Sequence, residues 1–172
     1  MDAREGAAPA VAVRPWEPAD LDAMTAIWNE VVREGRAFPQ TDELPGADAA
    51  AAFFGAQTRA AVAAGASGEV LGLYVLHPNN VGRCAHVANA SYAVAASARG
   101  RGIGRALVAD SLAALAPCGF RGLQFNAVVA SNAGAIALYE SLGFARVGTV
   151  PGGFLNPDGA YEDIHLFYHP AD

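Results

Sequence analysis

Residues 99–104, with the sequence Arg-Gly-Arg-Gly-Ile-Gly, have the composition of a phosphate-binding loop. Three glycines at alternate positions let backbone N–H groups converge on one point, because glycine adopts conformations closed to other residues. The apolar spacing that follows predicts a helix over 102–116, whose positive dipole end lies at the same point. Arg99, Arg101 and Arg105 add guanidinium groups that can chelate a pyrophosphate. An ordinary glycine-rich turn before a helix is the alternative interpretation.

Two better-known phosphate loops do not fit this stretch. The dinucleotide fingerprint G-x-G-x-x-G requires a third glycine at the position that Arg105 occupies. The Walker loop requires Gly-Lys, and the sequence contains no lysine. The pattern that remains is R-x-x-G-x-G, formed by Arg99, Gly102 and Gly104.

The composition is that of a folded, acidic chain. Its 172 residues are 53% hydrophobic and 16% charged, with a formal net charge of −6. We expect one domain over residues 11–172 after a disordered leader over residues 1–10.

The acidic balance argues against nucleic acid or a membrane as partner. The sequence has neither a signal peptide nor a membrane-spanning run, so we expect a cytoplasmic protein. Cys84 and Cys118 are too few for a disulfide framework and are expected to be reduced and buried.

The apolar periodicity and the turn signals predict an α/β fold: a mixed sheet with helices on its faces, in the order β-α-α-β-β-β-α-β-α-β-β. The expected helices cover 21–34, 48–57, 102–116 and 132–142, and the expected strands cover 11–16, 59–64, 69–76, 86–94, 122–130, 144–150 and 161–168. The turn residues of 151–153 and 156–159 are expected to separate the last two strands. His165 and His169 do not share a helix face and have no cysteine pair beside them, so no metal site is expected.

A second motif lies over Asn132–Phe144, with the sequence NAGAIALYESLGF. An asparagine begins the predicted helix, Tyr139 lies two turns on, and Leu-Gly-Phe ends the segment. With R-x-x-G-x-G before it, in this order and spacing, the chain resembles the GNAT superfamily of N-acetyltransferases over nearly its whole length. The resemblance implies the GNAT fold and acetyl-CoA as cosubstrate.

The resemblance also implies how acetyl-CoA is held. Loop amides from Arg101 to Arg105 would hold the pyrophosphate, and Val94 and Ala96 would offer backbone groups to the pantetheine arm, which can pair like an added strand. The family often has proline at the place of Ala96, so the loop entry is less rigid here. The implied contacts are Val94, Ala95, Ala96, Arg99, Gly100, Arg101, Gly102, Ile103, Gly104, Arg105, Asn132 and Tyr139.

Tyr139 is the catalytic acid that the resemblance implies. A phenol with a pKa near 10 can protonate a departing thiolate, and a backbone N–H of Val94 or Ala95 would stabilise the oxyanion. The alternative interpretations are a packed helix residue for Tyr139 and a helix cap for Asn132. The general base stays open among His86, Asn89, Glu30, Glu34, Asp163 and a water chain.

A narrower resemblance lies in segments 86–92, 124–129 and 148–154. They resemble the branch with the L-azetidine-2-carboxylate (proline-analogue) acetyltransferases, with phosphinothricin acetyltransferases as more distant relatives. That branch acts on small amino acids or amines, and an asparagine at the position of Asn126 holds the substrate. We therefore expect Asn126, Phe38 and Asn89 to contact the acceptor. Among Trp16, Trp28 and Phe38, we expect Phe38, in a proline-rich loop, to be the least core-like.

Other functions remain open beside a small-amine acetyltransferase that detoxifies an amino acid or toxin. Within the superfamily the alternatives are an antibiotic or a protein N-terminal acetyltransferase. From another class, a non-catalytic acetyl-CoA sensor would keep the loop and lose the chemistry, against which Tyr139, Gln124 and Asn126 argue. A homodimer is expected, because the last strands of such folds often pair across subunits.

Overall fold

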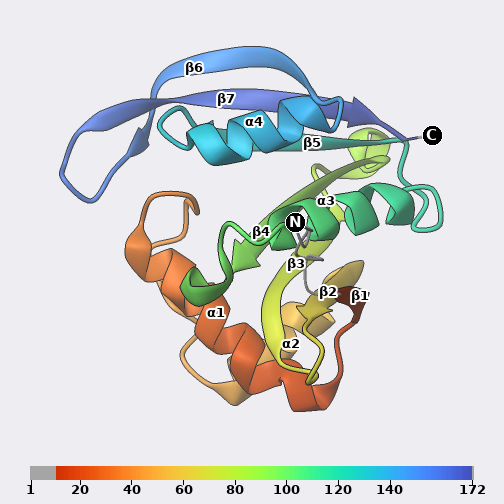
Figure 1. Cartoon of the computed structure of the whole chain (residues 1–172). Helices are drawn as coiled ribbons and strands as arrows, with labels where there is room; N and C mark the ends of the chain where they lie inside the picture. The colour runs from red at the N-terminus through yellow and green to blue at the C-terminus, as the bar shows by residue number, and fades with distance from the viewer. Residues whose placement is uncertain (1–10, 172) are drawn as a thin grey trace, which may run out of the picture.

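The computed structural model describes residues 11–171 (Figure 1), and the expected leader lies outside them. One seven-stranded sheet has the order β1-β2-β3-β4-β5-β7-β6. Its strands are Ala12–Pro15 (β1), Arg59–Ala64 (β2), Val70–Pro78 (β3), Val87–Val94 (β4), Gly122–Val129 (β5), Ala145–Leu155 (β6) and Tyr161–Pro170 (β7). The helices are Leu21–Glu34 (α1), Ala47–Gly55 (α2), Ile103–Ala114 (α3) and Ala133–Ser141 (α4). The predicted fold class and element order are confirmed.

The alternation of side chains along β2 and β3 produces two cores, one on each face of the sheet. Ala61 and Tyr74 belong to the core with α3 and α4. Val62 and Val75 belong to the core with α1 and α2. Helix α1 buries the apolar stripe that the sequence predicts and ends at Gly35, whose φ of 63° is left-handed.

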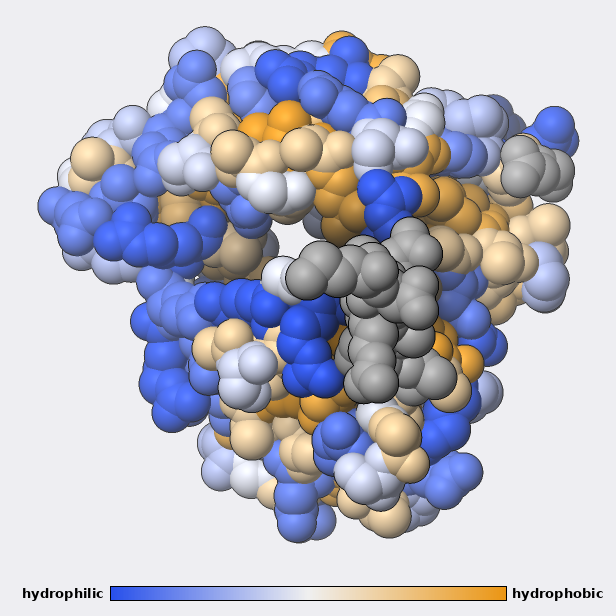
Figure 2. Space-filling model, viewed as in Figure 1, coloured by the Kyte–Doolittle hydropathy of each residue, from blue (hydrophilic) through white to orange (hydrophobic). Residues whose placement is uncertain are grey.

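The sheet opens between β4 and β5, the one parallel pair in the described chain. These strands pair at Val87 with Gly122 and at Ala88 with Leu123. Beyond these pairs β4 continues to Val94 without β5 beside it, and the half of the molecule with α4, β6 and β7 diverges from the half with α1 and α2 (Figure 1). Figure 2 shows a hollow at the centre of this face, between the two halves.

Strand β5 carries a bulge at the opening. Phe125 pairs with Phe167 and Val128 pairs with His165, so β5 has one residue more than β7 across this interval. The extra residue lies at Asn126 and Ala127. A bulge bends its strand and re-aims nearby side chains, and here it affects the asparagine expected to hold the substrate.

Two expectations are wrong. Residues 151–153 do not separate the last strands but belong to β6, because β6 is an edge strand, where proline costs no ladder hydrogen bond. An irregular register between Val150 and Phe154 accommodates the extra residues. The two cysteines are free but not buried: Cys84 is exposed in a turn outside the sheet, and Cys118 is half-buried.

Candidate active site

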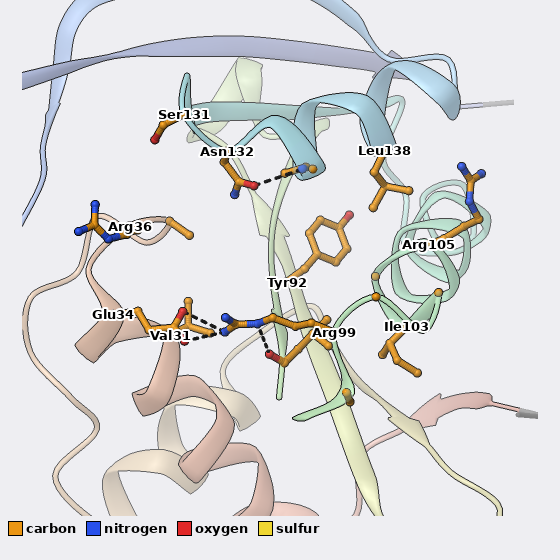
Figure 3. A pocket seen from close by; sticks show the side chains of 18 residues that line it. Val31, Glu34, Arg36, Tyr92, Arg99, Ile103, Arg105, Ser131, Asn132 and Leu138 are labelled. Carbon is orange, nitrogen blue, oxygen red and sulfur yellow. Dashed lines mark hydrogen bonds and ion pairs between the residues drawn. The ribbon is translucent and has the colours of Figure 1, made fainter. Parts of the chain in front are cut away.

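A cavity of about 750 Å³ lies where the sheet opens, between the end of α1, β4, the glycine loop and the start of α4 (Figure 3). Eight of the residues expected to contact acetyl-CoA line it: Val94, Arg99, Gly100, Gly102, Ile103, Gly104, Arg105 and Asn132. Four others, Ala95, Ala96, Arg101 and Tyr139, are not among its lining residues. We refer to this space as the donor cavity.

The glycine loop has the backbone of an anion cradle. Gly100 and Gly102 have φ values of 74° and 80°, in the left-handed region that glycine favours. Within residues 11–171 no side chain caps α3 at Gly102. The N–H groups of the first turn of α3 have no partner inside the helix and remain available to a phosphate. A Cβ added to Gly104 would lie 3.5 Å from Leu138, so the loop also packs closely against α4.

Two carboxylates of α1, Glu30 and Glu34, bond to groups at the end of β4 and in the glycine loop, beside the donor cavity. Arg99 Nη2 lies 2.9 Å from the Glu34 carboxylate, and Arg99 Nε donates to the Val94 carbonyl at 3.3 Å (Figure 3). The backbone N–H of Ala96 donates to Glu30 Oε2 at 3.0 Å. The backbone groups assigned to the pantetheine arm are therefore bonded to side chains of the chain itself.

Two further arginines border the donor cavity. Arg105 donates to Ser141 Oγ at 2.6 Å, and Arg36 donates to Asp158 Oδ2 at 2.9 Å. Sequence reasoning missed Arg36, because it lies 63 positions before Arg99 in an irregular segment without a motif. Arg36 lies at the cavity because it directly follows the end of α1, at Glu34 and Gly35, which borders the same cavity.

A second cavity, of about 430 Å³, adjoins the first and is referred to as the acceptor cavity. Tyr92 and Asn132 line both. In Figure 3 the Tyr92 ring lies between the α4 side, with Asn132 and Leu138, and the loop side, with Arg99. The described lining of the acceptor cavity contains no Asp, Glu, Lys or Arg. It includes the three residues expected at the acceptor, Phe38, Asn89 and Asn126, together with Tyr139, the expected catalytic acid.

Amide side chains form the polar wall of the acceptor cavity. Asn79 Oδ1 accepts from Asn89 Nδ2 at 3.1 Å and from Asn126 Nδ2 at 2.5 Å. Gln124 Nε2 donates to Asn126 Oδ1 at 2.9 Å. Sequence reasoning missed Asn79, whose one signal was its place directly after a strand. The network fixes the orientation of Asn126.

Phe38 lies deeper than expected. Its ring is 7% exposed and packs on Trp28, with ring centroids 4.5 Å apart. The expectation that Phe38 is less core-like than Trp16 and Trp28 is therefore wrong, because the loop after α1 folds back over the core and buries Phe38 more than Trp16. Phe38 nevertheless lines the acceptor cavity.

Tyr139 is surrounded by aromatic rings, with centroids of Phe125 at 4.5 Å and Phe144 at 5.6 Å. Burial raises the pKa of Tyr139 to about 12, so the phenol is protonated at neutral pH.

The two polar residues at the junction of the cavities, Tyr92 and Asn132, have partners within the chain. The Tyr92 hydroxyl is hydrogen-bonded to Ser111 Oγ of α3 at 2.7 Å. Asn132 Oδ1 accepts from the Ala135 N–H at 3.2 Å, so it caps α4.

Most base candidates from the sequence lie outside the acceptor cavity. Glu30 and Glu34 are bonded to the glycine-loop side as described. Asp163 Oδ1 accepts from the Gly152 N–H on the β6–β7 hairpin, and His86 lines a separate cavity. Asn89 does line the acceptor cavity, but an amide takes no proton at neutral pH.

Among residues 11–171, no three side chains of His, Cys, Asp or Glu gather closely enough to hold a metal ion. In the same part of the chain, none of the helices has the length and apolar character needed to cross a membrane.

Comparisons with known proteins agree with this geometry. The sequence model of the acetyltransferase (GNAT) family matches residues 22–144. The chain is 37% identical over 102 residues to N-acetyltransferase aca1 of Schizosaccharomyces pombe, a match that covers 58% of this chain and 49% of that protein. The chain thus spans about half the length of this curated relative.

Solved structures match over almost the whole chain. A GCN5-related N-acetyltransferase from Kribbella flavida is 41% identical, with a TM-score of 0.85 over 94% of this chain and 98% of that one. A GNAT superfamily phosphinothricin acetyltransferase from Sinorhizobium meliloti, solved in complex with acetyl-CoA, is 25% identical, with a TM-score of 0.86 over 94% of this chain and 88% of that one. Together with the match of the family model over residues 22–144, these similarities show that the chain belongs to the acetyltransferase (GNAT) family.

Proposed function

We propose that this acetyltransferase transfers the acetyl group of acetyl-CoA to the amine of a small molecule, such as an amino acid or a proline analogue. The observation that carries the proposal is the junction at Tyr92 and Asn132, where the donor cavity meets a small, uncharged cavity with an amide wall. Acetyl-CoA supplies an acyl group activated as a thioester. A cavity of about 430 Å³ suits a small acceptor better than an aminoglycoside or a peptide chain.

The residues of the donor cavity suit a pyrophosphate and an extended amide chain. The uncapped start of α3 offers N–H donors, and Arg105 lies beside them with a hydroxyl partner that it can exchange for a phosphate. On β4, the Val94 carbonyl and the Ala96 N–H would exchange Arg99 and Glu30 for the pantetheine amides. Binding therefore releases two side chains from the cavity edge.

The transfer needs no covalent enzyme intermediate. The lone pair of the amine forms the new C–N bond, and an N–H proton leaves the nitrogen. The electrons of the C–S bond leave with sulfur, which takes a proton from the Tyr139 hydroxyl. Tyr139 can supply this proton because its phenol is protonated in the acceptor cavity. The backbone N–H of Val94 stabilises the oxyanion, because the Ala95 N–H already donates to the Leu71 carbonyl at 3.0 Å.

Asn126 is the group that we propose to hold the acceptor. Its side chain is part of the amide network and lies at the β5 bulge. Amides both donate and accept, so they can bind an amino-acid carboxylate and an amine without adding charge. The phosphinothricin acetyltransferase among the structural relatives supports an amino-acid-like acceptor.

A panel of amino acids that includes azetidine-2-carboxylate, assayed with acetyl-CoA for release of free thiol, tests the proposal. We expect turnover of at least one small amine and none of aminoglycosides or peptides. Tight acetyl-CoA binding without turnover of any small amine would contradict it, and turnover confined to peptides or aminoglycosides would favour those alternatives.

The Tyr139→Phe variant separates a catalyst from a sensor. We expect kcat to fall by about 10²-fold or more, because the thiolate loses its proton donor, while calorimetry shows an unchanged affinity for acetyl-CoA. An unchanged kcat would remove Tyr139 from the reaction. A sensor would have no rate to lose.

A further inference from the structure

The proposed transfer requires a group that takes a proton from the acceptor amine, and none of the residues that the sequence offered as a base can do so from the acceptor cavity. Three titratable side chains line the acceptor cavity: His77, Tyr92 and Tyr139. Burial raises the pKa of both phenols, which makes them proton donors or bystanders at neutral pH. Histidine is the side chain that exchanges protons most readily in this range.

We propose that His77, near the end of β3, is the general base that accepts the proton of the acceptor amine. The inference rests on the proposed function and adds a residue that the motifs do not include. His77 lies opposite Asn89 in the β3–β4 register, so it shares a face of the sheet with the amide wall. It lines the acceptor cavity together with Asn126 and Tyr139.

The backbone selects the tautomer of His77. Nδ1 lies 2.9 Å from the carbonyl oxygen of Pro78. A carbonyl oxygen only accepts, so Nδ1 carries the proton in the neutral ring. Nε2 then holds the free lone pair, which is the form that a general base needs.

The surroundings of His77 are polar but uncharged. Besides the acceptor cavity, His77 borders a cavity of about 200 Å³ with Trp28, Gln40, Phe53, Gln57, Val75 and Ser91. Among the described lining residues of the two cavities there is no carboxylate, lysine or arginine, and the other titratable side chains are Tyr92 and Tyr139. The imidazole of His77 is therefore the one basic side chain in these described walls that can take a proton from the amine.

The proton balance of the step is complete. As the amine nitrogen forms its bond to the acetyl carbon, its N–H bond breaks and the proton joins His77 Nε2, giving an imidazolium. The thiolate takes a separate proton from Tyr139. The imidazolium then returns its proton to solvent, and solvent restores that of Tyr139, so that the enzyme is regenerated.

The His77→Gln variant tests this role, because glutamine keeps a polar side chain but takes no proton. With the acceptor that wild type uses best in the amino-acid panel, we expect kcat/KM at pH 7 to fall by about 10²-fold. The limb of the wild-type profile on which kcat/KM rises with pH should disappear. The deficit should persist at pH 9 to 9.5, because the neutral amine still carries the proton that His77 removes as the C–N bond forms.

The matched control is His86→Gln, which alters a histidine in a separate cavity. It should keep the wild-type rate and pH profile. Calorimetry with acetyl-CoA should give the same affinity for His77→Gln and wild type, since His77 does not line the donor cavity. A structural defect would instead lower affinity and rate together.

A measurement on wild type stands independently of any variant. Histidine ¹H–¹⁵N spectra should show His77 with its proton on Nδ1 when the ring is neutral. A proton on Nε2, or an unchanged rate and pH limb in His77→Gln, would overturn the role of His77 alone. Absence of turnover by wild type would overturn the proposed function, and the role with it.

Discussion

The chemistry of Tyr139 depends on its burial. Rings of Phe125 and Phe144 surround the phenol, and burial raises its pKa to about 12. The sequence offered a choice between a packed helix residue and an acid at the thioester. The structure shows that Tyr139 packs in the aromatic core and also lines the acceptor cavity, so one residue can have both roles.

The raised pKa of Tyr139 also predicts a loss of stability in alkali. In the unfolded chain the phenol ionises near pH 10, but in the folded protein near 12. Between these values the folded state binds more protons, so stability falls as pH rises, by up to about 1.4 kcal/mol per pH unit. In urea unfolding from pH 9 to 11.5, Tyr139→Phe should lose less stability than wild type. Equal losses would show that Tyr139 is solvated.

The arginines of the loop differ in their expected contribution to acetyl-CoA binding. Arg105 lines the donor cavity, whereas Arg101 is exposed and does not. Arg105→Ala should weaken binding by about 1 to 3 kcal/mol, the range for hydrogen bonds to charged groups. Arg101→Ala is the matched control and should have a smaller effect in calorimetry. The reverse order would mean that the loop rearranges around the pyrophosphate.

At the scale of elements, the position of α3 on the sheet sets the glycine loop. Gly72 of β3 lies beneath this helix. A Cβ added there would be 2.8 Å from the Ala93 carbonyl oxygen and 3.2 Å from both Ile103 and Leu107. Only glycine permits the close approach of α3 that places its first turn at the cavity. The need for glycine at position 72 arises from residues 21 to 35 positions further along the chain, so no local sequence motif indicates it.

Gly72→Ala should therefore disturb both packing and binding. We expect a loss of about 1 to 3 kcal/mol in urea unfolding, typical of an overpacked core, and weaker acetyl-CoA binding as α3 shifts. Gly55→Ala at the end of α2 is the control, since a Cβ there meets nothing within 4 Å. It should be neutral or stabilising. An unperturbed Gly72→Ala protein would show that the sheet yields without moving α3.

At the scale of the whole molecule, the opening between β4 and β5 turns a continuous sheet into two diverging halves. The donor cavity lies in this opening, and the hollow is visible in Figure 2. On the outer edge, β6 and the start of β7 expose large apolar side chains, among them Val147 at 58% and Tyr161 at 73%. The expected homodimer remains a prediction that these residues make testable.

Sedimentation velocity should give twice the chain mass of 17.6 kDa at micromolar concentration. Val147→Lys, on the exposed edge strand, should shift the protein towards monomer, because the dimer interface would bury a lysine ammonium without an opposite charge to pair with it. Val81→Lys is the control, as Val81 is 83% exposed and lies outside the strands. A monomeric wild type would contradict the expected homodimer.

The sequence by itself determined the features that depend on neighbouring residues. Helix periodicity, the stop at Gly35, the cap at Asn132 and the left-handed glycines of the loop arise from local backbone chemistry. The two motifs were therefore sufficient to predict the fold and the donor cavity. The same local reasoning failed at residues 151–153, because whether proline fits a strand depends on which strand is at the edge.

The tertiary structure alone decided which distant residues share a cavity. The acceptor cavity brings together His77 of β3, Asn79 directly after β3, and Asn126 of β5. Asn79 and Asn126 are 47 residues apart in sequence, and they lie close together only because both are at the opening of one sheet. Likewise, Glu30 bonds to Ala96 across 66 residues. Such contacts depend on register, bulges and strand divergence, which long-range packing sets. The sequence thus predicted the acetyl-CoA loop and three acceptor residues, Phe38, Asn89 and Asn126, whereas the places of His77 and Asn79 beside them are seen only in the folded chain.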